Sequence, residues 1–235
     1  PGCMDGHCRR PVAAIVVAAG SGSRLGADLP KAFVPLGGVP LLRRSAQALI
    51  DGGAGRVVVV APSSYLEATG SALEGLTVPW AVVAGGQRRQ DSVAAGLSAL
   101  EDMPPEAVVL VHDAARPLVP AAVVRATIDA VRGGAVAVIP AVPVVDSLRQ
   151  LRAGGSVGVD RSEFRAVQTP QAFHRQALVE AHAFVAAEGL EVTGDAAACE
   201  AHGHAVELVP GHADALKITE PLDLILAEAI LRGRT

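Results

Sequence analysis

Short apolar runs alternate with segments of helical spacing along most of the chain. Continuous apolar runs over residues 13–19 and 56–61 are typical of strands buried on both faces. Further strands are predicted over residues 78–84, 107–111, 135–142 and 205–209, and helices over 40–50, 64–73, 90–100, 120–132, 174–187, 195–201 and 220–231. This alternation predicts an α/β fold with a Rossmann-like, mostly parallel sheet and helices on both faces.

The alternation is interrupted between residues 143 and 168, where the sequence becomes more polar. The pair Gly154-Gly155 indicates a hairpin turn, so we interpret this segment as a two-stranded arm projecting from the sheet. Because the edges of such an arm expose unpaired backbone groups, we expect a partner subunit to cover them. Residues 1–10 are polar and are predicted to form a disordered leader before a single domain over residues 11–235.

Composition narrows the class of protein. Half of the residues are hydrophobic and the formal net charge is −4, which argues against disorder and against a general nucleic-acid binder. No apolar run approaches the roughly 20 residues of a membrane span, so we expect no membrane partner, and the polar residues 1–10 do not have the pattern expected of a signal peptide. The three cysteines are too few for a disulfide framework, so we expect the protein to be in the reducing cytoplasm.

A glycine-rich loop follows the first predicted strand. Gly20, Gly22 and Gly26 do not have the spacing of a dinucleotide fingerprint, and no Walker loop is present. Arg24 and Lys31 follow within the same segment. Backbone N–H groups and two cations in one loop favour a triphosphate, although a tight turn with two solvated cations is the simpler alternative.

Two other motifs lie where predicted strands end. Asp113 comes at the carboxyl end of a buried strand, where open α/β sheets bind ligands, and it could hold Mg²⁺ or a substrate hydroxyl. Arg116 could bind a phosphate, or it could form a local pair with Asp113. Gly85, Gly86 and Ser92 could contact a base or ribose, although a helix cap explains them nearly as well.

Together these motifs resemble the 2-C-methyl-D-erythritol 4-phosphate cytidylyltransferase family, from about residue 13 to 231. The matching segments are residues 18–20 with Arg24 and 30–31, residues 85–93, 113–117, 159–161 and 168–173, and residues 215–221. In this family, the substrate's phosphate attacks the α-phosphorus of CTP and pyrophosphate leaves. The chain departs from the family pattern at Ser23, Gln87 and Ser147, and no fused cyclodiphosphate synthase domain is expected.

The resemblance implies a role for each matching residue. Arg24 and Lys31 would stabilise charge on the triphosphate, and Arg161 and Lys217 would position the acceptor. The implied nucleotide-binding residues are Ala18, Ala19, Gly20, Gly22, Gly85, Gly86 and Ser92, and the implied acceptor-binding residues are Asp113, Ala114, Arg116, Ser147 and Thr169. Lys31 and Lys217 are also the two lysines of the chain, whose other 18 cationic residues are arginines.

The resemblance also implies a cofactor and a partner. Mg²⁺ or another divalent cation would bind mainly through the CTP phosphates, with Asp113 as the protein ligand. The chain would form a homodimer with crossing arms, so that Arg161 serves the partner's active site.

Four other functions are considered beside this one. A ribitol-5-phosphate cytidylyltransferase shares most of the motifs. The segment 85–92 argues against a sugar-1-phosphate nucleotidyltransferase that uses another base. A non-catalytic nucleotide sensor could lose Arg24, Lys31 or Lys217, yet all three are present. A metal-dependent glycosyltransferase would need an Asp-x-Asp motif at a strand end, which segment 112–115 does not supply.

Overall fold

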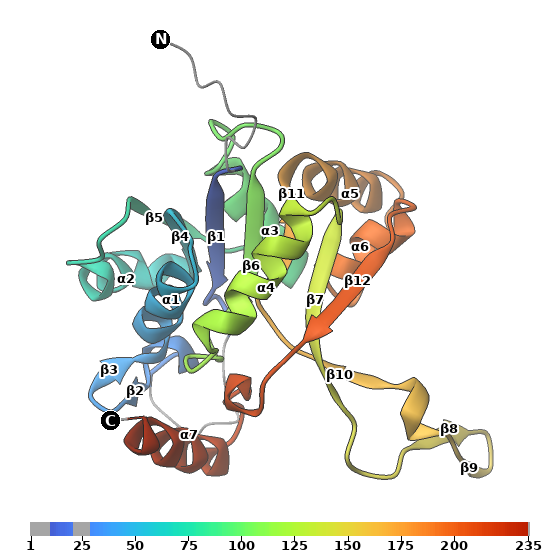
Figure 1. The fold of residues 1–235 in the computed structure, drawn as a ribbon. Helices are drawn as coiled ribbons and strands as arrows, with labels where there is room; N and C mark the ends of the chain where they lie inside the picture. The colour runs from blue at the N-terminus through green and yellow to red at the C-terminus, as the bar shows by residue number, and fades with distance from the viewer. Residues whose placement is uncertain (1–9, 21–28, 235) are drawn as a thin grey trace.

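The computed structural model describes residues 10–20 and 29–234 (Figure 1). Its centre is an eight-stranded sheet in the order β10-β7-β11-β6-β1-β4-β5, with β12 also paired to β7. The strands are β1 (Val12–Val17), β4 (Arg56–Ala61), β5 (Trp80–Ala84), β6 (Val108–Asp113), β7 (Ala137–Pro143), β10 (Arg165–Val167), β11 (Gln171–His174) and β12 (Val206–Pro210). Pairings of β1 with β4 and β6, of β4 with β5 and of β7 with β12 are parallel, whereas β10 and β11 pair antiparallel. The predicted mostly parallel sheet is therefore confirmed.

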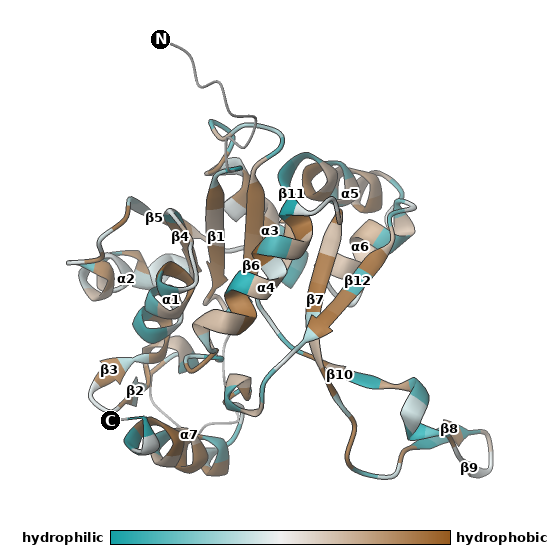
Figure 2. Cartoon of the chain, viewed as in Figure 1, coloured by the Kyte–Doolittle hydropathy of each residue, from teal (hydrophilic) through white to brown (hydrophobic). Residues whose placement is uncertain are grey.

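Alternate residues of the central strands point to opposite faces, and helices cover both. On one face, Ala14 and Val16 of β1 pack in a core with α1 (Leu41–Asp51), α2 (Leu66–Leu73) and α4 (Ala121–Arg132). On the other, Ile15 packs with α3 (Arg89–Ser98), α5 (Arg175–Ala187) and α6 (Asp195–Ala201). Figure 2 shows the strands of the centre as the most hydrophobic part of the chain, as expected for strands buried on both faces.

The predicted helices and strands are present with shifts of a few residues, and some elements were missed. The segment predicted as a helix over 64–73 opens with a 3₁₀ turn, η3 (Ser63–Tyr65), before α2. Strand β11 was not predicted, because four residues after a proline carry too little pattern to reveal a strand. Its pairing with both β6 and β7 buries Ala172 and Phe173 completely. The short pair β2 (Pro35–Leu36) and β3 (Val39–Pro40) was also missed.

The segment predicted as an arm leaves the sheet after β7 and extends away from it (Figure 1). Strands β8 (Arg149–Arg152) and β9 (Gly155–Gly158) pair with each other, and Gly154 turns between them with φ +83°. The chain passes η4 (Arg161–Glu163) and returns along β7 as β10. Val145 and Leu151 on the arm are 78% and 84% exposed, so much of its apolar surface is uncovered in the monomer.

The C-terminal helix α7 (Pro221–Gly233) packs near the carboxyl ends of the strands (Figure 1). It shares a third small core with Leu36, Leu41 and Ile218, all fully buried. No helix among the described residues is both long enough and apolar enough to cross a membrane.

Candidate active site

A cleft opens at the carboxyl ends of β1 and β6, beside the turn that joins β5 to α3. It has a volume of about 230 Å³. Its described lining residues are Val17, Ala18, Ala19, Gly20, Lys31, Ala32, Gly86, Gln87, Arg88, Arg89, Ser92, Asp113, Ala114, Ala115 and Lys217. Three motifs that are separate in the sequence therefore share one cleft, at the edge of the sheet where α/β proteins bind ligands.

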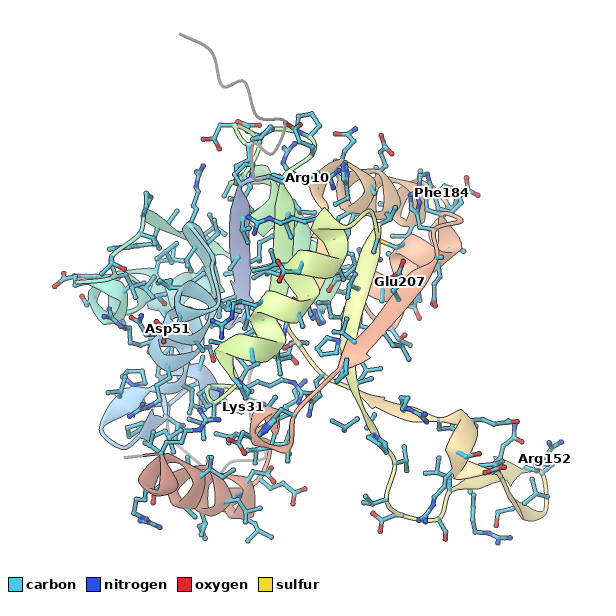
Figure 3. The ribbon with its side chains drawn as sticks, viewed as in Figure 1. Arg10, Lys31, Asp51, Arg152, Phe184 and Glu207 are labelled. Carbon is cyan, nitrogen blue, oxygen red and sulfur yellow. The ribbon has the colours of Figure 1, made fainter. Side chains whose placement is uncertain are left out.

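Both lysines of the chain line this cleft, although they lie near opposite ends of the sequence. Lys31 begins η2 (Lys31–Phe33), and Figure 3 shows it close to the lower ends of the central strands. Burial opposes ionisation of Asp223 on α7. Hydrogen bonds from Thr219 and Glu220 and the charge of Lys31 nevertheless lower its pKa. Lys31 is therefore close to the segment that carries Lys217.

Asp113 is the acidic residue among the described lining residues, and two cations hold its carboxylate. Its Oδ2 lies 2.8 Å from Lys217 Nζ, and its Oδ1 lies 3.4 Å from Arg89 Nη2. Burial alone would raise the pKa of this carboxyl group, but Arg89 and Lys217 together lower it to about 2. Asp113 is therefore ionised at neutral pH, and it holds Lys217 at the cleft.

A buried relay of hydrogen bonds fixes the strand end that carries Asp113. The Asp113 N–H donates to Thr169 Oγ1 at 3.1 Å, and the Thr169 hydroxyl lies 2.9 Å from His112 Nδ1. His112 Nε2 lies 3.1 Å from the Arg116 carbonyl oxygen. Burial lowers the pKa of His112 to about 4, so the ring is neutral, and these partners assign its proton to Nε2. Thr169 therefore supports Asp113 from behind rather than lining the cleft.

The turn before α3 brings backbone close to the cleft. A Cβ on Gly85 would lie 2.6 Å from Ala19 Cβ and 2.9 Å from Ser92 Oγ, so no larger residue fits there. Ser92 Oγ accepts a hydrogen bond from the Gly86 N–H at 3.2 Å, and Asp91 accepts one from the Arg88 N–H at 3.1 Å. The segment thus caps α3 and also lines the cleft, so the two sequence interpretations are compatible.

Arg116 is absent from the described lining of the cleft. Its Nη1 donates to the Ala215 carbonyl at 2.6 Å, and Nη2 lies 3.4 Å from the Val167 carbonyl. The Ile218 N–H donates to the Ala115 carbonyl at 2.8 Å. Arg116 and Ala115 thereby hold the segment just before and after Lys217. The phosphate contact considered for Arg116 from the sequence stays a prediction.

Besides Thr169, Arg116 and Gly85, four more predicted site residues lie outside this cleft or outside the described residues. Arg161 and Ser147 are exposed on the arm, and Arg161 Nη1 donates to the Val145 carbonyl within the arm. Arg24 and Gly22 fall in residues 21–28, outside the described part of the chain. The described lining of the cleft therefore includes Lys31 and Lys217 and most of the predicted nucleotide contacts, namely Ala18, Ala19, Gly20, Gly86 and Ser92, but it includes neither Gly85 nor an arm residue.

Arg89 is a cleft residue that the sequence interpretation did not single out. Besides contacting Asp113, its Nη1 lies 3.3 Å from Asp195 Oδ2, and Asp195 is 106 positions away in the sequence. The pair Arg88-Arg89 directly after Gly85-Gly86 was the available signal. The sequence could not tell which arginine faces the cleft's carboxylate.

The described acidic and histidine side chains form no ready-made metal centre. No group of three or more His, Cys, Asp or Glu side chains is placed to hold a metal ion among the described residues. Asp113 is available in the cleft, but cations already contact both its oxygens. Asp113 is thus the carboxylate among the described lining residues that would hold a divalent ion, and Arg89 or Lys217 would have to give up one of its oxygens.

A strand-end carboxylate, close-packed glycine turns and two lysines around one cleft define a nucleotidyltransferase of the Rossmann-like α/β type. The model of the 2-C-methyl-D-erythritol 4-phosphate cytidylyltransferase family matches residues 12–233. The chain belongs to this family.

Individual relatives agree with this assignment. The chain is 48% identical to the 2-C-methyl-D-erythritol 4-phosphate cytidylyltransferase of Streptomyces coelicolor, over 94% of this chain and 85% of that one. It is also 48% identical to the enzyme of that name from Saccharopolyspora erythraea, over 94% and 99% of the two chains. The crystal structure of the Thermus thermophilus enzyme superposes with a TM-score of 0.77 at 38% identity, covering 94% of this chain and 99% of that one.

Proposed function

We propose that this chain transfers CMP from CTP to 2-C-methyl-D-erythritol 4-phosphate, giving 4-diphosphocytidyl-2-C-methyl-D-erythritol and pyrophosphate in the non-mevalonate pathway to isoprenoid precursors. Membership of the cytidylyltransferase family supports this reaction. The observation that carries it is the meeting of Lys31, Lys217 and the glycine turns around Asp113 in one cleft.

The chemistry requires positioning and charge compensation more than proton transfer. The attacking phosphate is already an anion, so no strong general base is needed. The barrier lies in aligning two anions for in-line displacement, and fixed cations lower it. In this proposal Lys31 and Arg24 stabilise the charge that develops on the triphosphate. Lys217, directed by Asp113, receives the acceptor's phosphate.

The nucleotide's position follows from the two turns that border the cleft. Ala18, Ala19 and Gly20 follow β1, and their backbone can approach phosphate oxygens closely. Gly85, Gly86 and Ser92 form the opposite turn, where the close packing of Gly85 on Ala19 fixes its distance from the first turn. We assign this second turn to the base and ribose, and Ala114 with Asp113 to the acceptor.

A divalent cation, Mg²⁺ by preference, completes the proposal. When bound to the CTP phosphates, it neutralises charge on the leaving pyrophosphate. Asp113 is the carboxylate among the described lining residues that would hold it, and Lys31 lines the same cleft. Binding of CTP is expected to weaken when the divalent ion is removed with a chelator.

The first experiment is pyrophosphate release with CTP and Mg²⁺, with methylerythritol 4-phosphate and ribitol 5-phosphate offered separately and with ATP, GTP and UTP as controls. We expect release with CTP and methylerythritol 4-phosphate only. Release with ribitol 5-phosphate instead would keep the mechanism and change the acceptor. A folded protein that binds CTP but releases no pyrophosphate with either acceptor would be a nucleotide sensor.

The role of Lys31 is tested by Lys31→Ala. We expect kcat/KM to fall by roughly 10² or more, because removing one preorganised charge from a transition state has that order of effect. Arg125→Ala is the matched control. Arg125 is a solvent-facing cation on α4, and its Nη1 donates to the Asp51 carbonyl oxygen, 3.3 Å away. A Lys31→Ala enzyme within a few-fold of the control would refute the charge-stabilising role.

We further propose that the chain is a homodimer in which Arg161 of the arm completes the partner's active site. Three observations support this. The arm strands pair only with each other among the described residues, Val145 and Leu151 are uncovered, and Arg161 does not reach the cleft of its own chain. Ser147 on the same arm would then contact the acceptor from the partner side.

Mixed dimers test the shared site. Arg161→Ala and Lys31→Ala subunits are each expected to be nearly inactive alone. When mixed equally, half of the dimers are hybrids with one intact site of two, so about a quarter of parental activity returns. Failure to recover activity, with subunit exchange confirmed by mass, would mean that Arg161 acts within its own chain.

A further inference from the structure

Arg89 lies between two carboxylates that come from distant parts of the chain. Its Nη2 lies 3.4 Å from Asp113 Oδ1 in the cleft, and its Nη1 lies 3.3 Å from Asp195 Oδ2 behind the cleft. The Asp195 side chain is 3% exposed, whereas that of Arg89 is 36% exposed. Arg89, a partly exposed cation in the cleft, thus forms an ion pair with the buried Asp195.

Asp195 is itself held from the other side. It is the first residue of α6, and its Oδ1 accepts a hydrogen bond from His182 Nε2 of α5 at 3.0 Å. The helices α3, α5 and α6, which carry Arg89, His182 and Asp195, lie on the same face of the sheet (Figure 1). Both oxygens of Asp195 therefore have partners, and Asp195 itself is not among the described residues that line the cleft.

The neighbouring arginine behaves differently. Arg88 turns back on its own helix, with Nη2 2.8 Å from Asp91 Oδ1, and this pair is solvent-exposed. In Arg89, by contrast, each of the two terminal nitrogens of the guanidinium group faces a different carboxylate. Arginine can bridge two acids in this way, whereas the single ammonium group of lysine is not suited to it. Asp195 contacts Nη1 of the Arg89 guanidinium group, and Nη2 faces Asp113.

We propose that Asp195 is a positioning residue for the transfer reaction, acting through Arg89 on Asp113 and Lys217. This inference rests on the proposed function, because it assigns Lys217 to the acceptor phosphate. When that phosphate engages Lys217, the Asp113 carboxylate loses part of its counter-charge and would repel the incoming anion. Arg89 keeps Asp113 compensated, and Asp195 stops Arg89 from swinging toward the triphosphate.

The direction in which Asp195→Asn changes substrate binding distinguishes a positioning role of Asp195 from a long-range electrostatic one. Asp195 is an anion near a cleft that receives two polyanions, so Coulomb's law alone predicts that Asp195→Asn tightens substrate binding. Positioning predicts the opposite, because Arg89 would be released from its place. A purely structural role for Asp195 at the start of α6 would lower stability and leave the KM of the folded enzyme unchanged.

The test is a double-mutant cycle of Asp195→Asn and Arg89→Gln, read as kcat and KM for each substrate together with unfolding in urea. We expect Asp195→Asn to raise the KM for methylerythritol 4-phosphate about tenfold. In the Arg89→Gln background the same change should alter kcat/KM by less than twofold, because the residue it acts through is gone. The loss of unfolding free energy that Asp195→Asn causes, measured in urea, should be the same with Arg89 present and with Arg89→Gln.

Two results would overturn the inference. One is a folded Asp195→Asn enzyme whose acceptor KM falls or stays at the parental value. The other is an equal effect of Asp195→Asn with and without Arg89. Asp102→Asn is the matched control, since it removes an arginine–aspartate pair, Arg56 with Asp102 at 2.7 Å, that does not line the cleft. It should leave kcat/KM unchanged.

A second variant guards against misfolding of Asp195→Asn. Arg89→Lys keeps the charge on a partly exposed side chain, but one ammonium group cannot bridge both carboxylates, so acceptor KM should again rise about tenfold. Parental values for Arg89→Lys would refute the bridge. If the unsubstituted protein shows no turnover, dissociation constants for CTP and for methylerythritol 4-phosphate, measured by calorimetry, replace the KM values in comparing the variants. Parental turnover therefore decides the proposed function, and the variant ratios decide the inference.

Discussion

Removing the Thr169 hydroxyl should damage the strand end that carries the cleft's carboxylate. Thr169→Val keeps the side chain's shape but leaves two buried groups without partners, the Asp113 N–H and His112 Nδ1. His112 is fully buried and Thr169 is 5% exposed, so water does not readily replace the lost hydroxyl. Each unsatisfied buried group costs about 1–3 kcal/mol, which gives about 2–6 kcal/mol in total.

Urea denaturation, followed by circular dichroism, measures this loss. Thr127→Val is the control, because Thr127 is also fully buried and its hydroxyl donates to the Val124 carbonyl at 2.8 Å within α4. That carbonyl keeps its helical N–H donor, so we expect a loss below about 1 kcal/mol. Unfolding free energies of the two variants within about 0.5 kcal/mol of each other would refute the reasoning.

The same relay should affect catalysis as well as stability. Without Thr169 Oγ1, the Asp113 backbone is free to shift, and the 2.8 Å contact between its carboxylate and Lys217 is less well held. We therefore expect Thr169→Val to lower kcat/KM below that of Thr127→Val, even under conditions where both are fully folded. Equal kcat/KM values would mean that the relay serves stability alone.

Two further predictions concern the cleft's glycine turn and the buried histidine. Gly85→Ala would place a Cβ 2.6 Å from Ala19 Cβ, so it should raise the KM for CTP and lower the unfolding free energy by about 1–3 kcal/mol. Gly55→Ala is the control, because its Cβ would lie 3.7 Å from the nearest atom and should not affect KM. Equal KM values for the two variants would contradict this. Burial lowers the pKa of His112 to about 4 in the folded protein from the ordinary 6.5, so between these values the unfolded chain binds one proton more. The unfolding free energy should therefore fall by about 3 kcal/mol as pH drops from 6.5 to 4, and His112→Gln should remove that part of the slope. The Asp113 contribution is lost only below its ordinary pKa of 3.8, as pH falls toward 2, so a parental slope unchanged in His112→Gln would contradict the assignment.

Local pattern was enough to predict most of the elements. Apolar runs of strand length and helical spacing depend on neighbours in the sequence, so β4 and α6 were predicted with the bounds that the structure has. Glycines beside strand ends, and Asp113 at the end of β6, also marked the cleft correctly, because the carboxyl ends of parallel strands meet at one edge of a sheet. The sequence alone therefore determined the fold class and the edge of the sheet where the cleft lies.

Tertiary structure decided which side chains meet. Strand β11 is held by antiparallel pairing with both β6 and β7, and nothing in its four residues indicates this pairing. The contacts of Thr169 with Asp113, and of Arg116 with the segment around Lys217, likewise join parts of the chain that the sequence does not show to be neighbours.

The bridge from Asp195 through Arg89 to Asp113 likewise joins residues far apart in the chain. Contacts of this kind depend on how helices pack across a sheet face. Sequence spacing does not encode the distance between two side chains on different elements, and only the packed structure sets it.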